Sequence, residues 1–451
     1  MKKREPPVKI KLQHKIQVNR RFSKEMFKNQ NEKLRLIQPG MIIIGVDVAK
    51  RSHWMQPMHY NGILIGKAFN IKNTREGFES LAAKIERIKQ ETGCQRVLVG
   101  MEPTGHYWKA LAWFLMQNGI TVVLVNPYHV KKSKELDDNT PSKSDPKDAG
   151  IIGRLVKEGR FMTAYLPQGI YGELRTLSNL RAQILAKLHA VKNIITAILD
   201  EYFPEFETVF KNFDGKAALH ILNQCPFPEE LKKLGVAGII AEFNKAVKRA
   251  VGKKRAESLY QAACKTIGLP VNDGIKMKLR LCLDDFKSLT VQIETIEQEM
   301  EKQLIATGLS DYLLSIKGIG VVLAAGLLGE IGDPSRFESW KHIRKLAGFN
   351  LVEESSGEKK GQHKISKRGR PLLRGYLYQA ALIMAAKNKE FKELYHYLTS
   401  RKQNPLKKKQ ALVAIASKLI RVIQALISRK EKYDPSKVLG PIREIQLKEA
   451  A

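Results

Sequence analysis

Short β-branched runs alternate with stretches of helical period over residues 41–126, and this alternation restricts the fold more than any other feature of the chain. The run Met41–Ala49 has the composition of a buried strand. Two strand-like pieces follow, Ser52–Tyr60 and Ile63–Ile71, and Asn61-Gly62 between them is a strong β-hairpin signal. The sequence therefore predicts three strands in succession at the start of this region.

Predicted helices and strands then alternate over residues 75–126. Arg75–Thr92 repeats apolar residues every three or four positions, and Gly93 ends the pattern. Arg96–Glu102 and Ile120–Asn126 are strand-like, and Tyr107–Asn118 between them suits a helix. This order predicts a mixed α/β sheet with helices packed against it. It is also the element order of the ribonuclease-H-like fold, although fold alone does not establish function.

The period changes to helical from about Glu173. Apolar residues keep helical spacing from Leu174 to Ile198, and a second stripe, from Leu279 to Leu304, is close to a heptad repeat. The two stripes could pack as an antiparallel pair in one chain or form a dimer seam. Residues 205–275 between them are expected to form shorter helices.

A third, helical region begins near Asp311. The segment Leu314–Leu323 resembles a helix-hairpin-helix turn, in which Gly318-Ile319-Gly320 would offer backbone N–H groups to a phosphate. A plain packing turn is the alternative. We expect four segments in all: a basic arm over 1–40, an α/β domain over 41–165, a helical coiled-coil region over 166–310 and a C-terminal helical domain over 311–451.

Charge is the most unusual property of the composition. Lys and Arg number 78 against 45 Asp and Glu, a net charge of +33, so a polyanion is the expected partner. Residues 1–40 alone hold twelve Lys or Arg against three Glu, which indicates a basic, poorly ordered arm or a merely solubilising extension. The longest nearly apolar stretch, Ile319–Leu328, is too short to span a bilayer, so no membrane partner is expected. Four scattered cysteines indicate reduced thiols in the cytoplasm.

Four carboxylates stand out against this basic background. Asp47 lies inside the first predicted strand, Glu102 ends the fourth, and Asp145 and Asp148 open a predicted helix. If the first and fourth strands are neighbours, the acids can converge and hold two divalent ions on a phosphodiester. Oxygen ligands of this kind suit Mg²⁺ or Mn²⁺. The alternatives are that Asp145 is only a helix cap and that Asp47 only caps a turn.

These acids and their neighbours carry a resemblance to a known family. Ile44–Lys50, Glu102–Tyr107 and Lys143–Ala149 resemble the three acidic blocks of DEDD transposases of the insertion-sequence 110 family, which are bridge-RNA-guided serine recombinases. Leu346–Gly357 and Ile365–Arg374 resemble the family's C-terminal transposase domain. The long helical middle and the arm over residues 1–40 depart from the family pattern.

The resemblance implies a RuvC-like N-terminal domain, a Holliday-junction-resolvase version of the ribonuclease-H fold. It makes Asp47, Glu102, Asp145 and Asp148 catalytic metal ligands, and it places a nucleophilic serine before Gly357, which is Ser356 with Ser355 as the neighbouring alternative. Cations follow the serines and are either phosphate contacts or a solvated basic loop. Those assigned to nucleic-acid binding are Lys364, Lys367, Arg368, Arg370 and Arg374.

The function implied is RNA-guided strand exchange that moves an insertion sequence. The expected partners are DNA, as element ends, donor and target, and a structured guide (bridge) RNA. A homo-oligomer, dimer or tetramer, is expected because each chain carries one such serine, and the setting would be the prokaryotic cytoplasm near the nucleoid. The alternatives are a metal-dependent nuclease or junction resolvase, in which Ser356 is incidental, and a non-catalytic nucleic-acid-binding scaffold.

Overall fold

The structure is a computed structural model that describes residues 30–138, 145–247, 252–353 and 363–450. The chain divides into two compact units, Met1–Leu166 and Pro167–Ala451. The first is mixed α/β, and the second is helical apart from one short hairpin, in agreement with the predicted fold class. The finer division into four segments stays a prediction.

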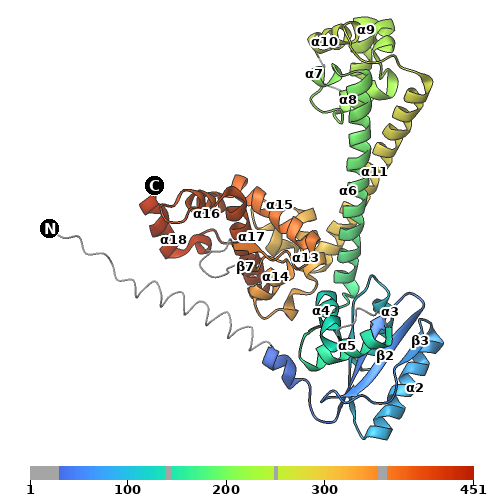
Figure 1. The fold of residues 1–451 in the computed structure, drawn as a ribbon. Helices are drawn as coiled ribbons and strands as arrows, with labels where there is room; N and C mark the ends of the chain where they lie inside the picture. Colours follow the sequence, from blue (N-terminus) through green and yellow to red (C-terminus); the bar gives the residue numbers. More distant parts are fainter. Residues whose placement is uncertain (1–29, 139–144, 248–251, 354–362, 451) are drawn as a thin grey trace, which may run out of the picture. The chain divides into compact units, whose positions relative to one another are not determined.

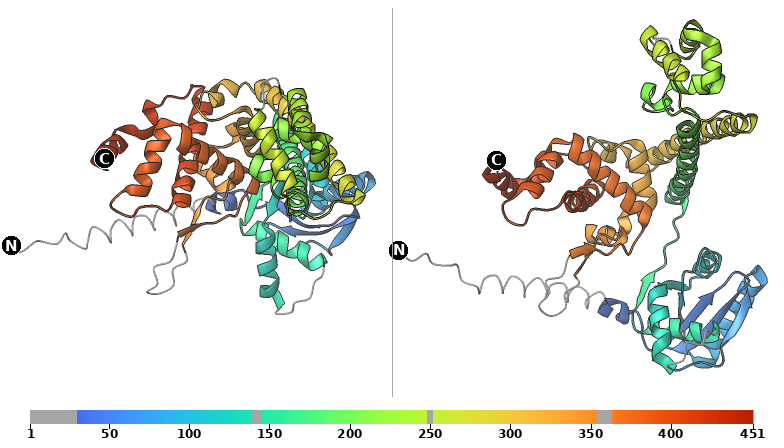
Figure 2. Two further views of the ribbon diagram at one scale, coloured as in Figure 1. Left: turned by 90° about the horizontal axis from the view of Figure 1, so that it is seen from above. Right: turned by 45° about the horizontal axis from the view of Figure 1, so that its top comes forward.

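The first unit contains a six-stranded mixed sheet with the order β3-β2-β1-β4-β5-β6 (Figure 1). In Figure 2 its strands, drawn in blue, form one twisted layer. The parallel pairs are β1 with β4 and β4 with β5, and the other pairs are antiparallel. The predicted element order and the neighbouring positions of the first and fourth strands are therefore confirmed. The strands are β1 (Met41–Val48), β2 (Ser52–His59), β3 (Phe69–Lys72), β4 (Arg96–Met101), β5 (Thr121–Val125) and β6 (Phe161–Thr163).

The prediction for residues 63–71 was only partly right. The strand β3 covers Phe69–Lys72, and before it there is a single isolated bridge between Met58 and Leu64. Gly66 has a φ of 64°, which breaks the extended conformation between the two pieces. The strand β6 and the helix α4 (Pro127–Asp138) were not predicted, because three residues of strand and a polar helix carry little periodic signal.

Helices cover both faces of the sheet because successive residues of a strand point to opposite sides. The even-numbered residues of β1, such as Ile42 and Ile44, pack with α2 (Arg75–Thr92) and α3 (Trp108–Gln117). The odd-numbered residue Ile43 belongs to a second core with α5 (Asp145–Lys157). As predicted, α2 ends at Gly93, in the left-handed conformation.

The helix α5 lies unusually close to the sheet at two glycines. Gly45 of β1 and Gly100 of β4 are opposite each other in the parallel register. A Cβ on Gly45 would collide with the backbone of Ala149 and Gly153, and one on Gly100 would collide with the side chain of Val156. The two glycines therefore form a groove in the sheet, which we call the glycine groove, and α5 occupies it.

The predicted basic arm is ordered over its last residues, and this part of the prediction was wrong. Residues 30–35 are helical. Gln30 Nε2 donates to the carbonyl oxygen of Glu158, and Lys33 Nζ donates to that of Phe161 at 2.6 Å. These bonds attach the end of the arm to the edge of the first unit. Residues 1–29 lie outside the described residues.

Two long helices, α6 (Gly169–Tyr202) and α11 (Asp273–Ala306), pack along each other within one chain (Figure 1). This packing resolves the alternative between an intrachain pair and a dimer seam in favour of the pair, whereas coiled-coil geometry stays a prediction. Four helices connect them, as expected for residues 205–275, and Gly235 introduces a kink in the third. They are α7 (Phe206–Val209), α8 (Lys216–Gln224), α9 (Pro228–Ala246) and α10 (Lys253–Cys264).

The rest of the second unit is built around α13, which is buried almost all round and packs on α6, α11 and α15. Tyr376 of α15 packs on Gly326 of α13, and its hydroxyl lies 3.0 Å from Ser178 Oγ of α6. The elements are α12 (Ser310–Leu314), α13 (Val321–Ile331), η1 (Pro334–Arg336), α14 (Trp340–Leu346), β7 (Leu351–Glu353), β8 (His363–Ile365), α15 (Pro371–Lys387), α16 (Lys389–Ser400), α17 (Lys408–Arg429) and α18 (Ser436–Ala450).

The turn between α12 and α13 contains Gly318 with a φ of 106°, a conformation that favours glycine. A Cβ on Gly318 would collide with Met384 of α15. This glycine is therefore explained by packing, and the helix-hairpin-helix assignment of the turn stays a prediction.

Two helices, α6 and α17, are long and apolar enough to cross a membrane by length and composition alone. Neither helix contains a long uninterrupted apolar run, because polar residues recur along both. Their apolar residues are part of the core of the second unit: Leu174 and Ile195 of α6 and Ile415 and Leu419 of α17 are fully buried. This burial is the usual arrangement of an amphipathic helix in a globular core.

Gly45→Ala should destabilise the first unit, because the added methyl group collides with the backbone of α5. We expect a loss of about 1–3 kcal/mol in the free energy of unfolding, as for other overpacked cores. Gly150→Ala is the matched control within α5 itself, since its Cβ would meet only Gln56 at 4.0 Å. Urea unfolding measures both variants, and equal stability of the two would contradict the glycine groove.

Candidate acidic site

Asp47 and Glu102 lie next to each other at the carboxyl ends of two parallel strands. Val46 of β1 is opposite Met101 of β4, and the amide of Glu102 donates to the carbonyl oxygen of Val46 at 3.4 Å. Asp47 has the same strand parity as Gly45, and Glu102 the same as Gly100. Both carboxylates are therefore on the face of the sheet that α5 covers.

Asp148 reaches the same place from the first turn of α5. Its side chain is only 5% exposed, although it is an acid. Burial of a carboxylate is expensive unless it is paired. The position of Asp148 follows from the glycine groove, because α5 can lie this close to the sheet only where β1 and β4 carry no side chain.

Electrostatics show that the three acids act on one another. Burial raises the pKa of Glu102, and the neighbouring carboxylate of Asp47 and, more weakly, that of Asp148 raise it further. Negative charges close together favour the protonated form of one of them. At Glu102, burial and the neighbouring carboxylates therefore outweigh the effect of the nearby cation.

Lys134 of α4 is this nearby cation. Its Nζ forms a close ion pair with Asp148 Oδ2, and its side chain is 28% exposed. The same cation lowers the pKa of Glu102. The other oxygen of Asp148, Oδ1, is buried and has no hydrogen-bond partner within the described part of the chain. Sequence reasoning did not identify Lys134, because a lysine in a polar helix carries no local signal.

The acids do not form a ready-made metal site. Within the described ranges, no group of three or more His, Cys, Asp or Glu side chains is placed to hold a metal ion. Asp145, the first residue of α5, is exposed. The structure thus brings Asp47, Glu102 and Asp148 within electrostatic reach of one another, with a lysine beside the third acid.

The predicted nucleic-acid contacts of the second unit divide into two groups. Lys364, Lys367 and Arg368 are exposed. Arg370 and Arg374 are half-buried, and their guanidinium groups donate to backbone carbonyl oxygens: Arg370 to Glu330, and Arg374 to Ala347 at 3.1 Å. The hydrogen bonds of these two arginines hold the loop before α15 against α13 and the end of α14. Their assignment to nucleic-acid binding stays a prediction.

The two candidate nucleophiles, Ser355 and Ser356, lie outside the described residues. The strands on either side of them in the sequence, β7 and β8, pair antiparallel, with Glu353 opposite His363. The assignment of Ser356, like that of the basic residues, stays a prediction.

Comparison with protein families gives two matches. Residues 44–204 match a family model described as "Transposase", the DEDD type of insertion sequence 110, and residues 310–396 match one described as "Transposase IS116/IS110/IS902 family". The two matched segments together span more than half of the chain. They include all four predicted acids and the five predicted basic residues.

Several full-length relatives are also similar. An uncharacterised protein of insertion element IS116 from Streptomyces clavuligerus is 23% identical over 88% of this chain and 96% of its own length. The transposase for insertion sequence element IS1111A from Coxiella burnetii is 23% identical over 95% of this chain and 99% of its own. A putative transposase for IS117 from Streptomyces coelicolor is 25% identical over 76% and 85%.

Lys134→Met should destabilise the protein, because it leaves the buried carboxylate of Asp148 without its cation. We expect a loss of about 1–3 kcal/mol in the free energy of unfolding, measured in urea with EDTA present. The second change Asp148→Asn should restore part of this loss. Lys131→Met, on the exposed side of the same helix, should change stability by less than about 0.5 kcal/mol. A Lys134→Met variant as stable as Lys131→Met would show that the ion pair is unimportant.

Proposed function

Because this chain belongs to the insertion-sequence 110 family of transposases, we propose that it moves an insertion sequence by strand exchange at the site of Asp47, Glu102 and Asp148. The observation that carries the proposal is the convergence of three carboxylates from β1, the end of β4 and α5 in a chain of net charge +33. Acids that only capped turns and helix ends would not need to share one place. Asp145, exposed at the start of α5, is proposed as the fourth acid of the set.

The residues at this site fit a divalent cation. Their donors are carboxylate oxygens, the ligands preferred by Mg²⁺ and Mn²⁺. The buried Oδ1 of Asp148 has no hydrogen-bond donor among the described residues, and burial, together with the neighbouring carboxylates, raises the pKa of Glu102. A cation bound by these acids would neutralise charge on a phosphodiester. The acids would hold the cation, and the cation would replace Lys134 as the partner of Asp148 Oδ2.

We propose Ser356 as the nucleophile. Its Oγ would attack phosphorus, so that a serine–phosphate bond forms, the bond from phosphorus to one deoxyribose oxygen breaks, and the serine proton ends on that oxygen. The phosphoester remains available to a second strand, and attack by the hydroxyl of that strand completes the exchange and frees the serine. The exposed cations Lys364, Lys367 and Arg368 are proposed to contact phosphates close to it.

The proposed partners are element-end and target DNA and a structured guide RNA. Guide pairing would carry the sequence specificity, while the protein contacts backbones. A dimer or tetramer is proposed because two duplexes must be cut by chains that each supply one such serine. The proposed place of action is the prokaryotic cytoplasm at the nucleoid. These proposed partners are supported by the family matches and by the net charge of +33.

Asp47→Asn, Glu102→Gln and Asp148→Asn should each lower strand cleavage by about 100-fold or more, because each removes a carboxylate charge that would hold the cation. Cleavage of labelled element-end DNA, with flanking-region RNA and Mn²⁺, measures this effect. EDTA should abolish the reaction, and Mn²⁺ should restore it. Glu91→Gln, an exposed acid on α2, is the control with the same loss of charge. Binding of DNA in EDTA should be unchanged, and cleavage that persists in EDTA would contradict the metal site.

Ser356→Ala should abolish a covalent protein–DNA adduct, whereas Ser355→Ala should retain it. The adduct is detected as labelled DNA that stays with the protein in denaturing electrophoresis. Metal-dependent cleavage that survives Ser356→Ala would favour a hydrolytic nuclease or junction resolvase. No cleavage and no adduct, with RNA binding intact, would favour a non-catalytic scaffold.

A further inference from the structure

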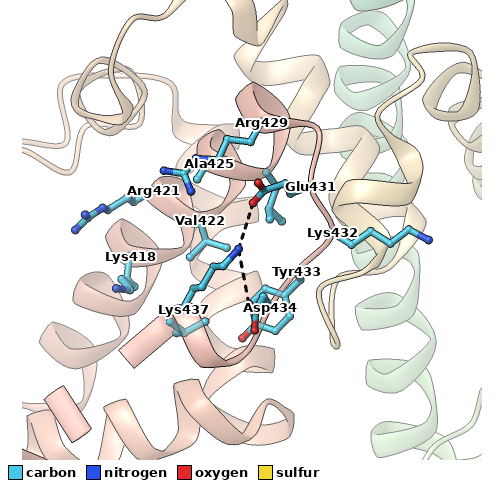
Figure 3. A pocket seen from close by; sticks show the side chains of 12 residues that line it. Lys418, Arg421, Val422, Ala425, Arg429, Glu431, Lys432, Tyr433, Asp434 and Lys437 are labelled. Atoms are coloured by element: carbon cyan, nitrogen blue, oxygen red, sulfur yellow. Dashed lines mark hydrogen bonds and ion pairs between the residues drawn. The ribbon is translucent and has the colours of Figure 1, made fainter. Parts of the chain in front are cut away.

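A second concentration of positive charge lies in the second unit, on the last turns of α17 and the segment after it. Lys418, Arg421 and Arg429 fall on one stripe of α17, at helical spacing, with the small residue Ala425 between the two arginines. They line a cavity of about 240 Å³ together with residues 431–434, 437 and 438 (Figure 3). The opposite, apolar side of α17 is buried, so this stripe is the part of the helix available to a partner.

The two acids that line this cavity, Glu431 and Asp434, already pair with a lysine of the same segment. Figure 3 shows Lys437 between Glu431 and Asp434, with Nζ at 3.4 Å and 3.7 Å from the two carboxylates. Asp434 also accepts hydrogen bonds from the amide and the hydroxyl of Ser436, which lower its pKa. By contrast, Arg421 and Arg429 form no ion pair among the residues that the structure describes. The cavity therefore has a net positive charge.

Tyr433 connects this cavity to a second one. Its amide donates to Ser315 Oγ at 2.8 Å, and its hydroxyl lies 3.3 Å from Glu390 and 3.4 Å from Asn388. These bonds attach the segment after α17 to α12 and to the junction of α15 and α16. Tyr433 also lines a second cavity, of about 550 Å³. Its exposed cations, which also lack ion pairs within the described ranges, are Lys317, Lys387, Lys389 and Lys392.

We propose that the two cavities form one basic strip, the Tyr433 strip, which holds the sugar–phosphate backbone of duplex DNA at a place distinct from the acidic site. A single phosphate would fill only one cavity, whereas a strand carries a phosphate at every nucleotide and can occupy both. The strip offers charge but no free ring for stacking on unpaired bases, since Tyr433 is the only aromatic residue among the described residues that line either cavity, and its hydroxyl is engaged. Backbone contact of this kind fixes position without reading sequence.

This inference rests on the proposed function only for the choice of DNA as the polyanion. The experiment is therefore performed in EDTA, where a metal at the acidic site cannot contribute to binding. The full-length chain is titrated against labelled duplex DNA at salt concentrations from about 50 to 200 mM. The double variant Arg421→Gln/Arg429→Gln should reduce the slope of log K against log salt by about two, because two phosphate contacts are lost.

Three comparisons make the result specific. Arg421→Lys/Arg429→Lys keeps the charge and should keep the slope. Lys278→Gln/Arg280→Gln removes the same charge from exposed positions on α11 and should leave the slope nearly unchanged. An unchanged slope in the glutamine double variant, or an equal drop in the α11 variant, would overturn the proposal. A drop seen with a structured RNA but not with duplex DNA would also overturn it, in favour of an RNA contact.

Discussion

The close approach of α5 to the sheet is the contact on which the acidic site depends. Two glycines that face each other in the register of β1 and β4 leave the glycine groove, and α5 lies in it with backbone against backbone. The placement of the three acids depends on this close packing. Strand alternation places Asp47 and Glu102 on the face of the sheet that α5 covers, and α5 carries Asp148 to the same region. A methyl group in the groove would move the third acid away from the first two.

Three carboxylates that lie close together repel one another, and Lys134 offsets part of this repulsion. The lysine pairs with Asp148 and lowers the pKa of Glu102, but it neutralises only part of the charge. Asp148 Oδ1 is buried and has no hydrogen-bond partner among the described residues. Under the proposed function, a divalent cation at these acids would let a phosphodiester approach carboxylates that would otherwise repel it, in a chain of net charge +33.

The basic residues of the second unit differ in the groups that the fold places beside them. Arg370 and Arg374 belong to a basic run next to the candidate serine, yet their guanidinium groups donate to backbone carbonyls and hold a loop in place. Arg421 and Arg429 lie in a helix whose sequence reads as an ordinary amphipathic stretch. They have no ion-pair partner among the described residues and face a cavity. The difference is decided by which carbonyls and carboxylates the fold brings near each guanidinium group.

Local patterns were sufficient to predict most elements of the first unit, the two long helices and the polyanionic partner. These depend on hydrophobic period, turn residues and composition, which are properties of neighbouring positions. The break at Gly66, the helix α4 and the ordered end of the arm were missed, because short or polar segments take their structure from distant contacts. Tertiary structure alone placed Asp148 against the strands, paired it with Lys134 and left Asp145 exposed. Burial and charge pairing arise between segments far apart in the chain, and no local spacing encodes them.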